Sequence, residues 1–207
     1  MSDQRNVGFG LTVVTVLFGI ALIYSGWIVV RELEAQVIDT AASGLPERPD
    51  PHGGFSTIAA RCGDRCLPRG HRAAASGLLK MARTSARPLQ TFDLAAAHAR
   101  QALAEEPLSA DGWALLAATQ AGPTDQWTRE VGVDLERSYS AAPRSRTASA
   151  WRILFCARHW TALDVDLRRR ALTEFVWLAA IDRPLAERLL SRIQDPAASL
   201  AFGLSLG

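Results

Sequence analysis

The chain of 207 residues has almost no lysine and almost no net charge. It carries 23 basic and 21 acidic side chains, for a formal net charge of +2, and Lys80 is its only lysine. The arginines are scattered and form no long basic run. A near-neutral chain offers little electrostatic attraction to a polyanion. We therefore expect no nucleic acid among its partners.

Recognisable catalytic motifs are also missing. The sequence contains no glycine-rich phosphate loop, no histidine–glutamate spacing of the metalloprotease type and no serine nucleophile motif. The four histidines, His52, His71, His98 and His159, are dispersed. We expect His98 on the surface of a helix. The sequence thus predicts a protein that is not an enzyme and that has no catalytic residues, cofactor or metal ligands.

The sequence also has few patterns typical of β-strands. Alternation of apolar and polar residues, which is typical of half-buried strands, is nearly absent, whereas apolar residues at helical spacing recur along the chain. Apolar residues make up 48% of the sequence, which is sufficient for a core. These patterns predict an all-α fold.

The longest uncharged run covers residues 7–30, with the sequence VGFGLTVVTVLFGIALIYSGWIVV. At about 1.5 Å per residue, a helix of this length crosses a hydrocarbon core of roughly 30 Å with some tilt. Tyr24 and Trp27 lie near its end, where amphipathic rings prefer the headgroup region. Because the run exceeds the apolar core of a signal peptide, we predict an uncleaved, single-pass transmembrane helix.

One face of this predicted helix carries small residues. They fall within about 60° of one another on a helical wheel at roughly 100° per residue. The residues of this face are Gly8, Thr12, Thr15, Gly19 and Gly26. Small side chains let another transmembrane helix approach closely. We expect this face to contact another membrane protein subunit within the lipid bilayer, or a second copy of this chain.

Two closely spaced cysteines indicate the compartment. Cys62 and Cys66 lie among glycine, aspartate, arginine and proline, which suits a loop closed by a disulfide in an oxidising compartment. We therefore predict a bacterial inner-membrane protein with residues 1–6 in the cytoplasm and the C-terminal part in the periplasm. In the alternative interpretation, the cysteines bind a metal with His71 and with His52 or Asp64.

The rest of the chain divides by composition. Residues 31–70 combine a helical extension with a proline- and glycine-rich linker that contains the cysteine pair, and residues 71–207 are predicted to form a helical domain. Helices are expected over residues 73–84, from Thr91 or Asp93 to Leu103, over 163–180 and over 184–193, with a short last helix from Pro196.

A helix–turn–helix pattern recurs within this domain. A helix with small residues on one face ends at a proline, and the next helix carries a tryptophan near its start. The first copy consists of Ala95, Ala102, Leu103, Pro107, Trp113, Leu116 and Ala117. Pro143 and Trp151 follow Pro107 and Trp113 after 36 and 38 residues. The pattern resembles the tetratricopeptide repeat, whose period is about 34 residues.

The resemblance implies a small stack of antiparallel helix hairpins with a concave binding surface. Its core positions would be Ala95, Ala102, Pro107, Trp113, Leu116, Pro143 and Trp151. The first helix of each hairpin would line the surface and expose Arg152, His159 and Trp160, unless Trp160 packs against the terminal helices. We expect a non-catalytic accessory or scaffold subunit of an envelope complex, held together by protein–protein contacts. The alternative is an anchored periplasmic thiol- or metal-handling protein that uses Cys62 and Cys66.

Overall fold

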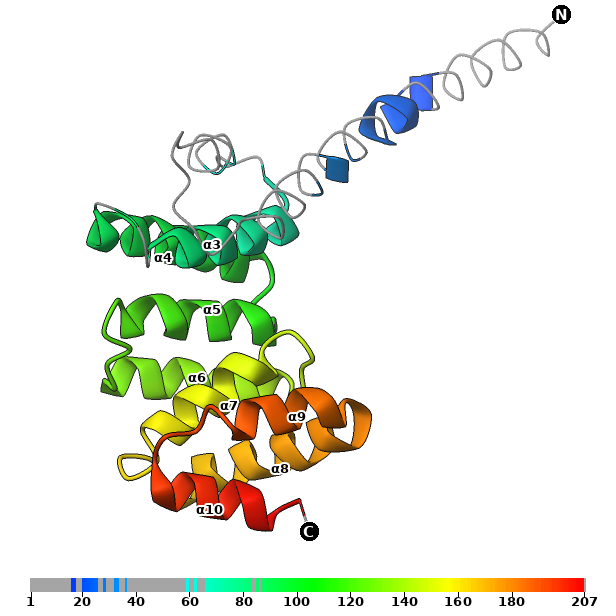
Figure 1. Ribbon diagram of the computed structural model, residues 1–207. Coiled ribbons are helices and arrows are strands. Elements are labelled where there is room, and N and C mark those ends of the chain that lie inside the picture. The colour runs from blue at the N-terminus through cyan, green and yellow to red at the C-terminus, as the bar shows by residue number, and fades with distance from the viewer. Residues whose placement is uncertain are drawn as a thin grey trace, which may run out of the picture.

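The computed structural model describes residues 16–17, 20–25, 28, 32–33, 36, 59, 62, 66–82, 85 and 87–206. Within these residues every regular element is a helix, which confirms the all-α prediction. The bounded helices are α3 (Pro68–Ala82), α4 (Pro88–Glu105), α5 (Ala110–Ala121), α6 (Arg129–Ala141), α7 (Ser149–Arg158), α8 (Val165–Ile181), α9 (Arg183–Leu190) and α10 (Pro196–Leu204) (Figure 1).

The predicted membrane segment is described only in part. The described residues between 16 and 36 are helical and exposed, and Glu32 forms an ion pair of 2.9 Å with Arg69 of α3. Among the residues that the structure describes, no helix is long and apolar enough to cross a bilayer. All five residues of the predicted small-residue face lie outside the described residues.

The helices stack in chain order. Helix α3 packs against α4, α4 against α5, and α5 against α6, while α7 to α10 form the C-terminal end of the stack (Figure 1). One large hydrophobic cluster extends from α5 to α10, and two smaller ones lie between α3, α4 and α5. The largest apolar core is therefore C-terminal, and the α3–α4 hairpin depends on smaller clusters.

Local signals explain where several helices begin. The Ser109 hydroxyl accepts from the backbone N–H of Gly112 at 3.2 Å, as expected of an N-cap, and Asp164 caps α8 in the same way. The predicted caps Thr91 and Asp93 are wrong. Helix α4 begins earlier, with Pro88 in its first turn, because the fixed φ angle of proline suits that position.

The two repeat prolines end helices and do not fill the core. Pro107 and Pro143 are exposed, and each follows a residue with non-helical φ and ψ angles after α4 or α6. A proline disfavours helical geometry in the residue before it, so both positions act through the backbone. Their assignment to the repeat core is therefore corrected.

The remaining predicted core positions divide by size. Ala95, Ala102 and Leu116 are buried. Trp113 and Trp151 are half-buried and pack against the edges of hydrophobic clusters. The small side chains admit a neighbouring helix, whereas the two indole rings keep one edge at the surface.

Candidate functional site

A pocket of about 370 Å³ opens between α3, α4, α5 and α7, near the turn that follows α5. We call it the groove. Its lining residues are Leu79, Ala82, Ser85, Pro88, Phe92, Ala118, Gly122, Pro123, Asp125, Trp151 and Arg158. Apolar side chains and polar atoms both contribute to this lining, so the groove suits a segment that combines apolar side chains with polar groups.

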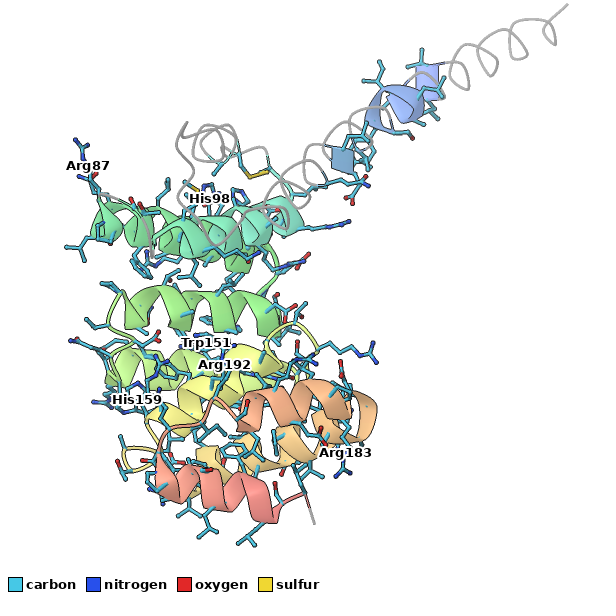
Figure 2. All side chains as sticks on the ribbon, in the orientation of Figure 1. Arg87, His98, Trp151, His159, Arg183 and Arg192 are labelled. Atoms are coloured by element: carbon cyan, nitrogen blue, oxygen red, sulfur yellow. A yellow bond between two sulfur atoms is a disulfide. The ribbon has the colours of Figure 1, made fainter. Side chains whose placement is uncertain are left out.

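Aromatic rings and one ion pair shape the groove at α7. Trp151 stacks on Phe155 with ring centroids 4.8 Å apart, and Arg158 forms an ion pair with Asp125. The Nε2 atom of His159 lies 2.7 Å from the backbone oxygen of Asp125 (Figure 2). Burial, and secondarily Arg158, lower the pKa of His159, which favours a neutral imidazole that donates this hydrogen bond. The α5–α6 turn is thereby fixed to α7.

Two of the three predicted surface residues are buried. Arg152 is 0% exposed and Trp160 is 8% exposed, whereas His159 is half-buried. Trp160 packs against Phe202 of α10, with ring centroids 5.5 Å apart, as the alternative interpretation expected. The binding surface predicted from Arg152 and Trp160 is therefore wrong, because Arg152 lies on the buried face of α7 and Trp160, in the turn after α7, packs against α10.

Arg152 belongs instead to a closed polar network between α6, α7 and α8, which we call the arginine network. Its Nε donates to Glu174 at 3.0 Å, its Nη2 pairs with the same carboxylate, and its Nη1 donates to the Ser138 hydroxyl at 3.2 Å and to the Ala142 carbonyl at 3.0 Å. Ser149 donates to Glu174 at 2.8 Å. Every nitrogen of the guanidinium and both carboxylate oxygens are satisfied.

The surroundings of this network are equally closed. The guanidinium lies 4.3 Å from the centroid of the Tyr139 ring, and the Tyr139 hydroxyl is 4.0 Å from the sulfur of Cys156. Burial raises the pKa of Cys156 to about 12, so this thiol stays protonated and is a poor nucleophile. The arrangement joins two hairpins and offers no chemistry to a ligand.

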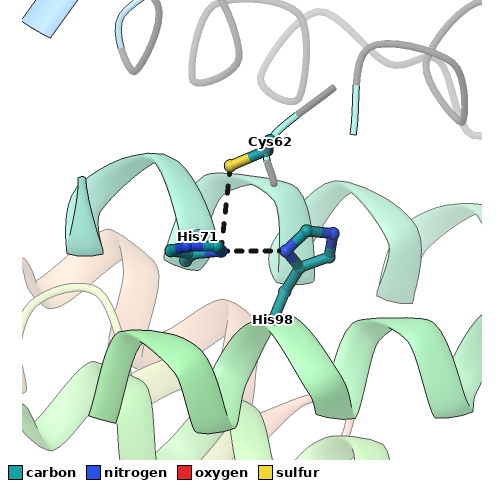
Figure 3. A group of neighbouring side chains, drawn as sticks. All are labelled: Cys62, His71 and His98. Carbon is teal, nitrogen blue, oxygen red and sulfur yellow. Dashed lines mark hydrogen bonds between the residues drawn. The ribbon is translucent and has the colours of Figure 1, made fainter. Parts of the chain in front are cut away.

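A second buried polar cluster lies beside α3 and α4, and we call it the histidine cluster. The Nδ1 atoms of His71 and His98 are 3.0 Å apart, and the Cys62 sulfur is 3.8 Å from Nδ1 of His71 (Figure 3). Cys62 and Cys66 form a disulfide. Within the described part of the chain, this is a group of three side chains whose ligand atoms all lie within 4.8 Å of one another.

His98 corrects the prediction that placed it on a helix surface. It is 7% exposed, and burial, followed by the nearby His71, lowers its pKa to about 4, so the imidazole is neutral at pH 7. Its Nε2 is buried and has no hydrogen-bond partner among the described residues. Of the candidate metal ligands predicted from sequence, Cys62, Cys66 and His71 come together here, and His52 and Asp64 lie outside the described residues.

The buried polar residues that the sequence analysis did not predict share one signal. On α4, His98 lies at a core position of the stripe formed by Ala95, Ala99 and Ala102. Arg152 likewise continues the buried stripe of α7, and Glu174 that of α8. Helical periodicity therefore marked all three polar side chains as buried, although their chemistry indicated exposure.

Comparison of the chain with protein-family models, curated proteins and solved structures finds no match. The tetratricopeptide resemblance accordingly stays a prediction. Any function assigned to this chain must be argued from its own groove and buried clusters.

Proposed function

We propose that this protein is a membrane-anchored, non-catalytic accessory subunit that uses its helical stack to hold a partner protein in a bacterial envelope complex. The observation that carries the proposal is the groove, which residues of α3, α4, α5 and α7 line together. These helices belong to three successive hairpins, so one partner segment in the groove would contact all three.

The chemistry of the groove selects the kind of partner. Leu79, Phe92 and Trp151 offer apolar surface, while Arg158 of the lining is already paired with Asp125. An uncharged segment of another envelope protein, with apolar side chains and backbone polar groups, fits this lining better than a charged peptide. Large aromatic side chains in such surfaces commonly act as anchors for binding.

The N-terminal helix supports the second attachment. In its described part, large apolar side chains are exposed, among them Leu17, Ile20 and Ile23. An exposed apolar helix suits lipid or another transmembrane helix. Two weak attachments to one complex reinforce each other through effective concentration, so neither surface has to bind tightly alone.

Site-specific photocrosslinking tests this proposal. A photoreactive phenylalanine analogue replaces Leu79, which lines the groove, or Leu89, which is 67% exposed and lies outside the groove lining. We expect the full chain, expressed in its own cells, to form one major adduct with a membrane protein from position 79 and none from position 89. Adducts of equal yield at both positions, or no adduct from position 79, would contradict the proposal.

Introducing a charge into the groove lining provides a second test. Leu79→Arg introduces a cation into the apolar lining, whereas Leu89→Arg places the same side chain on the exposed face of α4. We expect only Leu79→Arg to release the partner when the complex is purified in mild detergent. Circular dichroism confirms that both variants retain their helical content.

A further inference from the structure

The histidine cluster combines features that a purely structural contact does not require. Two imidazoles from different helices face each other through nitrogen atoms 3.0 Å apart, and a cysteine sulfur lies 3.8 Å from one of them. All three residues are buried, and the Nε2 of His98 has no hydrogen-bond partner within the described residues. A core of alanine and leucine would fill this space without leaving a buried polar atom uncompensated.

The distances match those between the ligands of a tetrahedral metal ion. With Zn–N of about 2.05 Å and Zn–S of about 2.3 Å, tetrahedral geometry places two nitrogens about 3.4 Å apart, and a nitrogen and a sulfur about 3.6 Å apart. The observed separations of 3.0 Å and 3.8 Å differ from these values by no more than about 0.4 Å. All three ligand atoms lie within 4.8 Å of one another, so small side-chain movements would bring them to tetrahedral distances.

Cys66 adjoins this group of three side chains. Its sulfur is covalently bonded to that of Cys62, and both cysteines are buried in the small hydrophobic cluster that they share with residues of α3 and α4. In the disulfide neither sulfur is a thiolate, and only thiolates are strong cysteine ligands. The oxidised chain thus offers two imidazoles, whereas the reduced chain offers two imidazoles and two thiols.

We propose that reduction of the Cys62–Cys66 disulfide creates a buried site for one Zn²⁺ ion, with Cys62, Cys66, His71 and His98 as its ligands. A dithiol reductant transfers two electrons through a mixed disulfide and becomes a disulfide itself, while this chain gains two thiols. Zn²⁺ then replaces the two thiol protons, which leave to solvent. The disulfide therefore acts as a redox-controlled block on the metal site. This inference is independent of the groove.

Metal titration of the full chain tests the proposal. The protein is purified in detergent, stripped with a chelator and divided into an untreated half and a half reduced with a phosphine, which converts the disulfide to two thiols. Zn²⁺ alone is then added in competition with a chromophoric chelator. We expect the reduced protein to bind one equivalent and the oxidised protein to bind none under the same conditions.

Co²⁺ in place of Zn²⁺ reports the ligand set. Tetrahedral coordination by two thiolates gives visible d–d bands together with sulfur-to-cobalt charge transfer, and we expect both only after reduction. Equal binding by the oxidised and reduced proteins would overturn the redox control. Absence of binding by reduced protein that keeps its helical circular dichroism would overturn the site.

Matched variants separate this site from adventitious binding. His98→Leu removes one proposed ligand, and His159→Leu removes the histidine at the C-terminal end of α7, which does not belong to the histidine cluster. Even the loss of an outer-shell partner weakens metal binding 10–100-fold, so we expect His98→Leu to weaken Zn²⁺ binding by at least about 100-fold. His159→Leu and Cys156→Ser should bind as the wild type does. Wild-type affinity in folded, reduced His98→Leu would contradict the assignment. If that variant fails to fold, the wild-type comparison before and after reduction still decides.

Discussion

Two buried polar clusters lie at different levels of the helical stack, and they are built on different plans. The arginine network, between α6, α7 and α8, pairs one guanidinium with one carboxylate and satisfies the donors of Arg152. The histidine cluster, beside α3 and α4, brings together two imidazoles and a disulfide and leaves Nε2 of His98 without a partner in the described structure. The first arrangement is complete, whereas the second leaves one buried ring nitrogen without a partner among the described residues.

The comparison shows that a buried polar group does not by itself indicate a binding site. A charged group deep in a protein is tolerated when its partners are complete, and removing one partner leaves an uncompensated charge. Imidazoles and a disulfide are less costly to bury than an ion pair, so they can lie in a core without a complete set of partners. We therefore assign a structural role to the arginine network and a ligand-binding role to the histidine cluster.

The largest expected effect comes from breaking the arginine network. Glu174→Ala leaves the Arg152 guanidinium buried without its carboxylate, and we expect the free energy of unfolding to fall by about 3–5 kcal/mol. Chemical denaturation of the full chain in detergent, followed by circular dichroism, measures this change.

The control is Glu187→Ala, which removes an exposed partner of Arg183 and should cost less than about 1 kcal/mol. Similar losses in the two variants would contradict the role given to the arginine network.

A smaller effect should follow reduction of the disulfide without added metal. Opening this short loop removes a constraint on the unfolded chain and should lower stability by roughly 2 kcal/mol. Hydrogen exchange should accelerate in α3 and α4 and stay unchanged in α7 and α8, because the two regions belong to separate hydrophobic clusters. In the double variant Cys62→Ser and Cys66→Ser, the reductant should have no effect. Uniform acceleration along the chain would show that the clusters are not independent.

Ser138 offers a finer test of the arginine network. Its hydroxyl donates to the Ala110 carbonyl at 2.7 Å and accepts from Arg152, so it links α5 to α7. Ser138→Ala should cost about 1–2 kcal/mol, since a buried hydrogen-bonding group loses its partner. Ser191→Ala, at an exposed position, should change the unfolding free energy by less than about 0.5 kcal/mol. An equal, negligible change in both would show that Arg152 does not need this contact.

The smallest effect is expected at the histidine cluster itself. In the oxidised, metal-free chain, His98→Leu loses the 3.0 Å hydrogen bond to His71 but also removes a buried nitrogen that has no partner in the described structure. Because these two effects oppose each other, the unfolding free energy should change by no more than about 1 kcal/mol. Thermal unfolding of the two oxidised proteins side by side measures the difference. A loss as large as that of Glu174→Ala would mean that the histidine cluster is a completed structural network too.

Local sequence signals predicted much of the helical layout. The prolines at 107 and 143 mark the ends of α4 and α6, and Ser109 caps α5, because these effects act within a few residues. Caps at Thr91 and Asp93 were predicted on the same principle and are wrong, since Pro88 already starts α4 in the preceding turn.

Local sequence signals could not predict which residues make up the buried clusters. The pairing of His71 with His98 depends on which faces of α3 and α4 meet, and the pairing of Arg152 with Glu174 depends on how α7 lies on α8. Residue type alone predicted exposure for His98 and Arg152. Their positions in the buried stripes predicted the opposite, and the structure shows that position outweighs residue type here.

X-ray absorption at the zinc edge tests the central claim most directly. The reduced full chain, loaded with one equivalent of Zn²⁺, should show two sulfur ligands at about 2.3 Å and two nitrogen ligands at about 2.0 Å. The oxidised chain, treated in the same way, should retain no zinc after desalting. A first shell of only nitrogen and oxygen in the reduced protein would contradict the assignment of Cys62, Cys66, His71 and His98 as one metal site.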